Sequence, residues 1–213
     1  EIHITVNNDD ISLEQFKEDC KNIDVKPIVL DLECSDSSII KDVMTSSKHY
    51  GDNLTVYEES ERIKCELLSK GYNVLRVKIE TSPFHPAAPT ECSNTEFPNG
   101  CYFESHIGII IDPSEKESLR TLINRLNNEG VNNKLFIGKS KLSQNFFKKS
   151  TDGSKYVNMV TYRNNKSGYN VFKDEVEILK STFKENNFDF EKVEVEYSIY
   201  DTNVSHDKNW LNN

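Results

Sequence analysis

The sequence predicts a protein of the α/β (α+β) class, with two pseudo-symmetric strand-helix lobes and mainly antiparallel sheets around a central cleft. Two observations lead to this fold class. Short runs rich in β-branched residues alternate with helical patterns along the 213 residues, and such interleaving is typical of mixed domains. The order of the runs also approximately repeats on either side of a Pro-rich stretch. We therefore expect one bilobal domain, with an N-terminal lobe over residues 1–81, a linker or lid over 82–100 and a C-terminal lobe over 101–213.

Four segments combine the apolar period of a helix with signals for its ends. The clearest begins at Asp112, has Pro113 at the first helical position and Glu115 as the partner in a capping box, and ends at Gly130. The other three begin at Ser12 and stop before Pro27, run from about Thr55 to Gly71, and run from about Phe172 to Asn186. Each shows an apolar stripe, so each helix is expected to pack against a sheet.

Between the helices lie runs that often alternate between apolar and polar residues, as half-buried strands do. The expected strands cover residues 2–6, 27–32, 73–80, 102–111, 134–138, 156–162 and 193–200. In each half, strand and helix alternate in a similar order, which is the basis for the expected pseudo-symmetry.

A short sequence echo supports the same duplication. Glu1–Val6 and Glu104–Ile109 share the pattern E-x-H-I-x-[V/I], and a capped helix follows each. Successive side chains of a strand point to opposite faces, so the isoleucines should lie under the helices while His3 and His106 point away from them. If the halves are related by an approximate two-fold axis, the two histidines face each other across a cleft. Each imidazole can act as a general acid or base near neutral pH.

A histidine followed by a hydroxyl residue, in the pattern H-x-[S/T] on a strand of each half, resembles the 2H phosphoesterase superfamily, the RNA-ligase-like cyclic phosphodiesterases. His3-Ile4-Thr5 matches the pattern, whereas Gly108 replaces the hydroxyl residue after His106. The resemblance implies cleavage of a cyclic or 2′-5′ linked nucleotide without a metal or other cofactor. In that activity His3 and His106 would be the catalytic acid and base, and Thr5 would contact the phosphate.

Hydroxyl groups and cations that could stabilise the phosphate charge occur in both halves. Arg76 and Lys78 alternate with apolar residues on one strand and should therefore point towards the cleft. The residues expected to bind the substrate are Thr45, Ser46, Arg76, Lys78, Lys139, Ser143 and Arg163.

Two other functions remain open. Gly108 favours a module that retains the cleft without catalysis and binds a nucleotide or a protein partner. Asp31 and Glu33 share one strand face and could hold a divalent cation in a metal-dependent nucleotidyl-transferring enzyme. A strand histidine taken alone is also more often structural than catalytic.

Charge and composition limit the partners and the compartment. The 26 basic and 35 acidic side chains give a formal charge of -9, which disfavours extended nucleic acid and leaves a small nucleotide or an RNA end. No run approaches the roughly 20 apolar residues of a membrane span. The five cysteines are an odd and sparse set, so we expect reduced thiols and a cytoplasmic protein.

Overall fold

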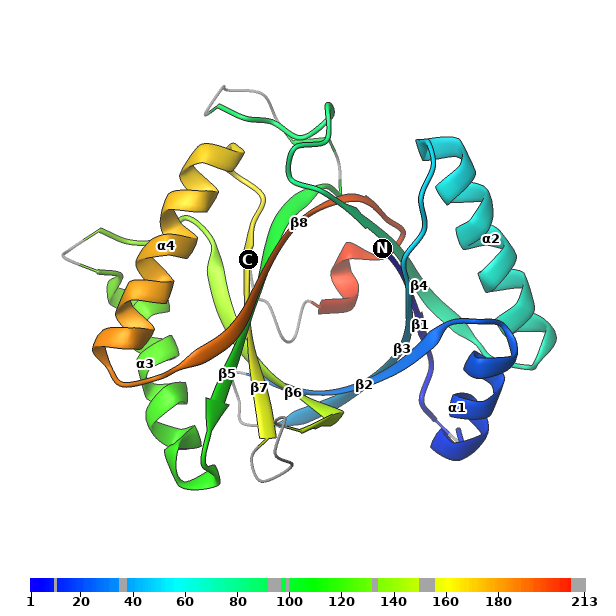
Figure 1. The fold of residues 1–213 in the computed structure, drawn as a ribbon, viewed down its shortest axis with the longest axis horizontal. Coiled ribbons are helices and arrows are strands. Elements are labelled where there is room, and N and C mark those ends of the chain that lie inside the picture. The colour runs from blue at the N-terminus through cyan, green and yellow to red at the C-terminus, as the bar shows by residue number, and fades with distance from the viewer. Residues whose placement is uncertain are drawn as a thin grey trace.

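The computed structural model describes residues 1–9, 11–34, 38–91, 97–98, 100–131, 134–149 and 156–207. Within these residues, eight strands form one closed barrel in the order β1-β3-β2-β6-β7-β5-β8-β4, and β4 pairs with β1 (Figure 1). The strands are β1 (Ile2–Val6), β2 (Lys26–Glu33), β3 (Ile39–Ser47), β4 (Val74–Thr81), β5 (Tyr102–Ile111), β6 (Lys139–Lys149), β7 (Tyr156–Asn164) and β8 (Phe190–Asp201). The helices are α1 (Leu13–Asn22), α2 (Asn53–Ser69), α3 (Lys116–Glu129) and α4 (Tyr169–Glu185), with short 3₁₀ turns η1 (Pro113–Glu115) and η2 (Val204–Asp207).

The same element order, βαββαβ, occurs over β1 to β4 and again over β5 to β8. Within each half, the first strand pairs with both the third and the fourth. The halves join through β2 with β6 and β4 with β8, and all of these pairings are antiparallel.

The prediction of two lobes around a cleft is therefore wrong. The strands at the edges of each half pair with those of the other half, so the two expected sheets form a single closed barrel. Closure satisfies the backbone groups that free edge strands would leave unpaired. Residue periodicity indicates which face of a strand is buried, but it carries no information on which edges meet.

Two strand predictions also need correction. Ile39–Ser47 forms β3 although no strand was expected there, and the strand expected at 134–138 lies instead at Lys139–Lys149. The inward positions of β3 include Asp42 and Ser46, which line the barrel cavity. A strand whose inner face is partly polar lacks the simple apolar alternation on which the prediction depended.

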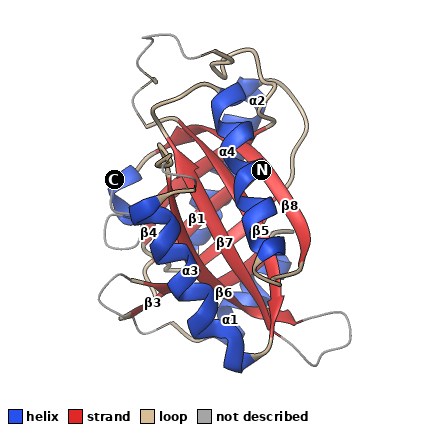
Figure 2. Ribbon diagram, turned by 90° about the vertical axis from the view of Figure 1, so that its left-hand side faces the viewer, coloured by secondary structure: helices blue, strands red, loops and turns tan. Residues whose placement is uncertain are grey.

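The helices cover the outside of the barrel, with α1 and α2 on one side and α3 and α4 on the other (Figures 1 and 2). Ile4 of β1 packs with Phe16 and Ile63 in one apolar cluster. On the opposite side, Ile107 of β5 packs with Phe172 in a second cluster. Full burial of such a side chain contributes about 1.5–3 kcal/mol. The hydrophobic core therefore lies between barrel and helices, which leaves the barrel interior available for polar groups.

Local capping explains where several helices begin. Ser12 Oγ accepts from Gln15 N at 3.3 Å before α1, and Asp52 Oδ1 accepts from Thr55 N at 2.8 Å at the start of α2. The expected capping box of Asp112 and Glu115 is confirmed, although it first forms η1 and only then α3. In the described residues, the structure contains no helix with the length and apolar character needed to traverse a bilayer.

Candidate functional site

The barrel encloses a cavity of about 560 Å³, within the range of small-molecule sites. One part of its wall is apolar and is formed by residues of β2, β3 and β7, namely Ile28, Leu30, Leu32, Met44 and Met159. The other part is polar and comes mainly from β1, β4, β5 and β8. A ligand in this cavity would thus meet an apolar and an ionisable surface at the same time.

The cavity has an open rim and a closed floor. At the rim, the side chains of Lys48 and Lys192 are 65% and 56% exposed. At the floor, the side chains of Arg76, Arg163 and Asp207 are only 4–5% exposed. The floor is closed by η2, which lies inside the ring of strands (Figure 1).

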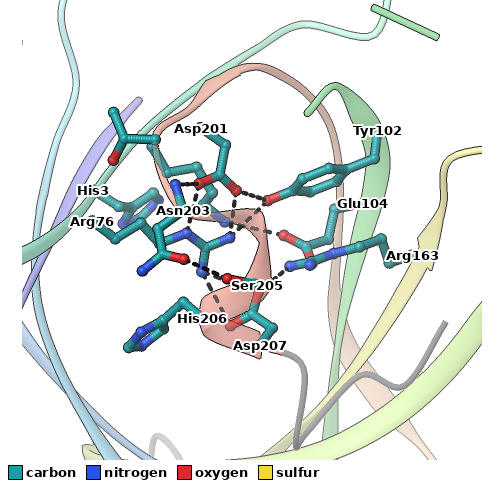
Figure 3. A network of polar contacts seen from close by, with 12 residues as sticks. His3, Arg76, Tyr102, Glu104, Arg163, Asp201, Asn203, Ser205, His206 and Asp207 are labelled. Atoms are coloured by element: carbon teal, nitrogen blue, oxygen red, sulfur yellow. Dashed lines mark hydrogen bonds and ion pairs between the residues drawn. The ribbon is translucent and has the colours of Figure 1, made fainter. Parts of the chain in front are cut away.

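The floor is an ion-pair network that links β4, β7 and η2 (Figure 3). Asp207 accepts from Arg76 Nη1 at 3.0 Å and from Arg163 Nη2 at 2.6 Å. Arg76 also binds Asp201 through two hydrogen bonds, and Arg163 donates to Glu104 at 2.9 Å. Burial alone would raise the pKa of Asp207, but the two guanidinium groups hold that pKa well below its usual range.

His3 of β1 is held between a carbonyl group and a buried carboxylate. Its Nδ1 lies 3.2 Å from the carbonyl oxygen of Thr45, and its Nε2 lies 3.0 Å from Glu80 Oε2. Because a carbonyl only accepts, Nδ1 carries a hydrogen and Nε2 faces Glu80. Burial would raise the pKa of Glu80, but Lys78 and His3 hold that pKa well below its usual value.

His106 of β5 lies on the same polar wall. Its Nδ1 is 3.0 Å from Thr161 Oγ1, while its Nε2 is 3.7 Å from Glu104 Oε2 and 3.9 Å from Glu196 Oε2. Burial lowers the pKa of His106, against the opposing effect of Glu104. Burial and the nearby charge of Glu80 raise the pKa of Glu196 to about 8.

Glu80 lies near both histidines. It contacts His3 directly, and one ligand atom each from Glu80, His106 and Glu196 lie within 4.8 Å of one another. The two halves of the chain thus each provide one histidine to a shared polar cluster, from β1 and β5, the first strand of each half.

The structure places the predicted site residues in two groups. His3, His106, Ser46, Arg76, Lys78 and Arg163 line the cavity. Ser46 Oγ donates to Glu1 Oε1 at 2.6 Å, beside His3.

The other predicted residues do not line the cavity. Thr45 Oγ1 accepts from Ile4 N and lies among the outward-facing positions, whereas Lys139 Nζ donates to the carbonyl oxygen of Asn127 on α3. Thr5 and Ser143 pair with inward-facing neighbours, yet both are buried beneath the lining. Strand alternation specifies on which face of the strand a residue lies. Whether an inward side chain reaches the cavity depends on the size and packing of its neighbours.

The carboxylates considered for a metal-dependent alternative lie outside the cavity. Leu30 and Leu32 face inward, so Asp31 and Glu33 face outward on β2. Glu33 pairs with Lys116 at 2.5 Å and with Arg120 at 2.7 Å, both from the α3 segment. Two cations already compensate this carboxylate.

Sequence reasoning missed the acidic half of the site, which includes Glu80, Glu104, Glu196, Asp201 and Asp207. A signal for part of it is present: Glu194 and Glu196 alternate with Val193 and Val195, and Glu80 continues the alternation of Arg76 and Lys78. Alternating charges on strands with an apolar outer face indicate a polar interior.

The chain matches no protein-family model and no curated protein. Among solved structures it is similar to a crystal structure of a "Putative monooxygenase" from Fusobacterium nucleatum subsp. nucleatum, with 8% sequence identity and a TM-score of 0.28. That alignment covers 92% of this chain and 88% of the other. A likeness at this TM-score assigns neither a fold family nor a function to the chain.

Proposed function

We propose that the barrel cavity is the active site of an enzyme that cleaves a small phosphodiester, such as a cyclic or 2′-5′ linked nucleotide. The observation that carries the proposal is that His3 and His106 line one cavity, with Glu80 in contact with His3 and within 4.8 Å of a ring nitrogen of His106. Two imidazoles at one site can serve proton transfers to and from water and the leaving oxygen. The substrate class is the one implied by the 2H resemblance.

The lining of the cavity suits a small ligand with an apolar part. The side chains of Leu30, Met44 and Met159 can pack against a flat base, while the polar wall faces a phosphate group. The volume of about 560 Å³ accommodates one nucleotide and not a polymer.

The charges of the cavity limit how anionic that ligand can be. Arg76, Lys78 and Arg163 line the cavity, but each is already paired with one or more buried carboxylates. Compensated cations attract an anion less strongly than free cations do. A phosphodiester with a single negative charge therefore fits this site better than a nucleoside triphosphate or an RNA strand.

Turnover of 2′,3′-cyclic nucleotides and 2′-5′ linked dinucleotides tests the proposal. We expect His3→Ala and His106→Ala each to lower turnover by about 10²- to 10⁴-fold, the range of general acid–base catalysis. His49→Ala is the matched control, because His49 bonds to Ser47 beside the cavity without lining it. Absence of turnover by the wild type, or full activity of the His3→Ala, His106→Ala double variant, would refute the proposal.

A second candidate is a module that binds the nucleotide without consuming it. Gly108 lines the cavity at the position where the 2H pattern has a hydroxyl residue, which favours this alternative. Thermal unfolding with the same panel separates the two functions. A ligand that raises Tm and remains intact indicates binding alone.

A further inference from the structure

We propose that Glu80, His106 and Glu196 form a binding site for a divalent transition-metal ion in the polar wall of the cavity. This inference goes beyond the proposed function, because it concerns ion binding and can be measured without turnover. It also differs from the metal-independent cleavage that the 2H resemblance implies.

The three side chains come from three neighbouring strands. Glu80 is on β4 and His106 is on β5, and Glu196 is on β8, which pairs with both. One donor atom from each lies within 4.8 Å of the other two. Donors around one ion are separated by about 3–4 Å when each metal–ligand bond is about 2.0–2.2 Å. Small side-chain rotations on a rigid barrel wall therefore suffice to close the site.

Neighbouring groups orient the proposed ligands as they do in metal sites. The contact of His106 Nδ1 with Thr161 Oγ1 at 3.0 Å directs Nε2 towards the carboxylates. Glu80 is oriented by His3, whose Nε2 lies 3.0 Å from Glu80 Oε2. A ligating carboxylate is commonly supported by such outer contacts.

Glu80 is also a buried carboxylate with unused acceptor capacity. Its side chain is 0% exposed, and neither of its oxygens makes a hydrogen bond among the described residues. Lys78 Nζ lies 2.8 Å from Oε1 and His3 Nε2 lies 3.0 Å from Oε2, which is one contact for each oxygen. Each carboxylate oxygen has two lone pairs, so one on each oxygen remains available. Buried carboxylate oxygens with unused acceptor capacity indicate a ligand that binds to them.

Glu196 has no strong cationic partner within the described part of the chain. Its ion-pair contact there is His106 at 3.9 Å, and no described lysine or arginine lies within 4.0 Å of it. Lys78 remains paired with Glu104 at 3.1 Å if Glu80 turns towards an ion. Glu80, His106 and Glu196 can therefore bind a metal ion while the ammonium group of Lys78 keeps a carboxylate partner.

The donor set indicates the class of ion. Two carboxylate oxygens and one imidazole nitrogen suit Mn²⁺, Fe²⁺ or Zn²⁺ better than Ca²⁺, which prefers oxygen ligands alone. Glu80 and Glu196 would together balance the charge of such an ion, which would therefore act as a Lewis acid and would not add net positive charge to the site. With an ion bound, His106 Nε2 would be a ligand and only His3 would transfer protons, so the ion-bound form and the two-histidine cleavage of the proposed function are alternative states of the site.

Mn²⁺ is the probe of choice, because the exposed thiol of Cys65 would bind Zn²⁺ on its own. Bound metal is first removed with a chelator, and the chelator is then removed by dialysis. The protein is titrated with Mn²⁺, and the concentration of free Mn²⁺ is followed by electron paramagnetic resonance. We expect one bound ion per chain, and affinity lowered at least about tenfold in His106→Ala and in Glu196→Gln. Glu194→Gln is the matched control, since Glu194 lines the same cavity on the same strand and pairs with Lys192.

Circular dichroism shows whether each variant is folded. Because Glu196 is partly exposed, Glu196→Gln provides a test even if His106→Ala does not fold. No Mn²⁺ binding by the wild type overturns the inference. Equal affinity in the wild type and Glu196→Gln also overturns it. Turnover recorded on the same samples is a separate result: ion binding without turnover contradicts the proposed function and leaves the ion site in place.

Discussion

Asp207 Oδ2 accepts a hydrogen bond of 2.6 Å from Arg163 Nη2 and thereby ties η2 to β7 inside the barrel. Both side chains are almost fully buried. The same carboxylate binds Arg76 of β4, so a single side chain joins the two halves of the chain at the floor of the cavity. Removing it would leave two buried guanidinium groups with less compensating charge.

Asp207→Asn should therefore lower the free energy of unfolding by about 3–5 kcal/mol, which is the cost of removing one charged partner of a buried ion pair. Urea denaturation of both proteins measures the difference. Glu177→Gln, at an exposed pair with Lys180 on α4, should change the free energy by less than about 1 kcal/mol. Equal effects of the two substitutions would contradict the role of Asp207.

The stability of the wild type should fall in acid. The folded-state pKa of Asp207 is well below its usual value, so its contribution is present above the unfolded-state pKa of about 3.9 and is lost as the pH falls towards the folded-state pKa. We expect the difference between wild type and Asp207→Asn to narrow as the pH falls below about 4. Urea denaturation between pH 7 and pH 3 checks this, and parallel stability curves would argue against it.

Phe103 should be one of the residues most sensitive to truncation. It is 0% exposed under α4, with ring centroids 5.0 Å from Tyr197 and 5.4 Å from Phe172. Phe103→Ala should cost about 3–5 kcal/mol, because lost burial and a residual cavity add. Tyr50→Ala, at a residue that is 94% exposed, should have little effect on the same denaturation curve.

Lys78→Gln should strengthen the binding of Mn²⁺. Lys78 Nζ lies 2.8 Å from Glu80 Oε1, so its positive charge repels an ion held by Glu80. Removal of this repulsion should raise the affinity by roughly tenfold or more. Lys48→Gln, at an exposed rim residue, should leave the affinity nearly unchanged. An unchanged or weaker affinity in Lys78→Gln would place the ion elsewhere.

The sequence predicted with local information alone that both histidines point away from the helices. Ile4 and Ile107 were expected under the helices and lie in the two apolar clusters. Because strand residues alternate, His3 and His106 must then face the other way. The capping box at Asp112 was equally local, since its partner Glu115 lies three residues away.

The sequence did not predict β3, the position of β6 or the acidic residues of the site. Asp42 and Ser46 occupy inward positions of β3 on either side of Met44, so the inner face of this strand is mixed and lacks a regular apolar alternation. Glu80 and Glu196 are 116 residues apart in number, and they meet only because β4 pairs with β8. Neither residue carries a local signal of the other.

The sequence by itself determined the four helices, the outer apolar faces and the direction of His3 and His106 away from the helices. These features depend on the helical and strand periods, which can be read within one segment of the chain. The tertiary structure alone decided that the halves share one closed barrel, that Asp207 closes its floor and that Glu80 lies near both histidines. These features follow from which strand edges pair, and that choice depends on the free energy of the whole assembled sheet and not on any segment of the chain.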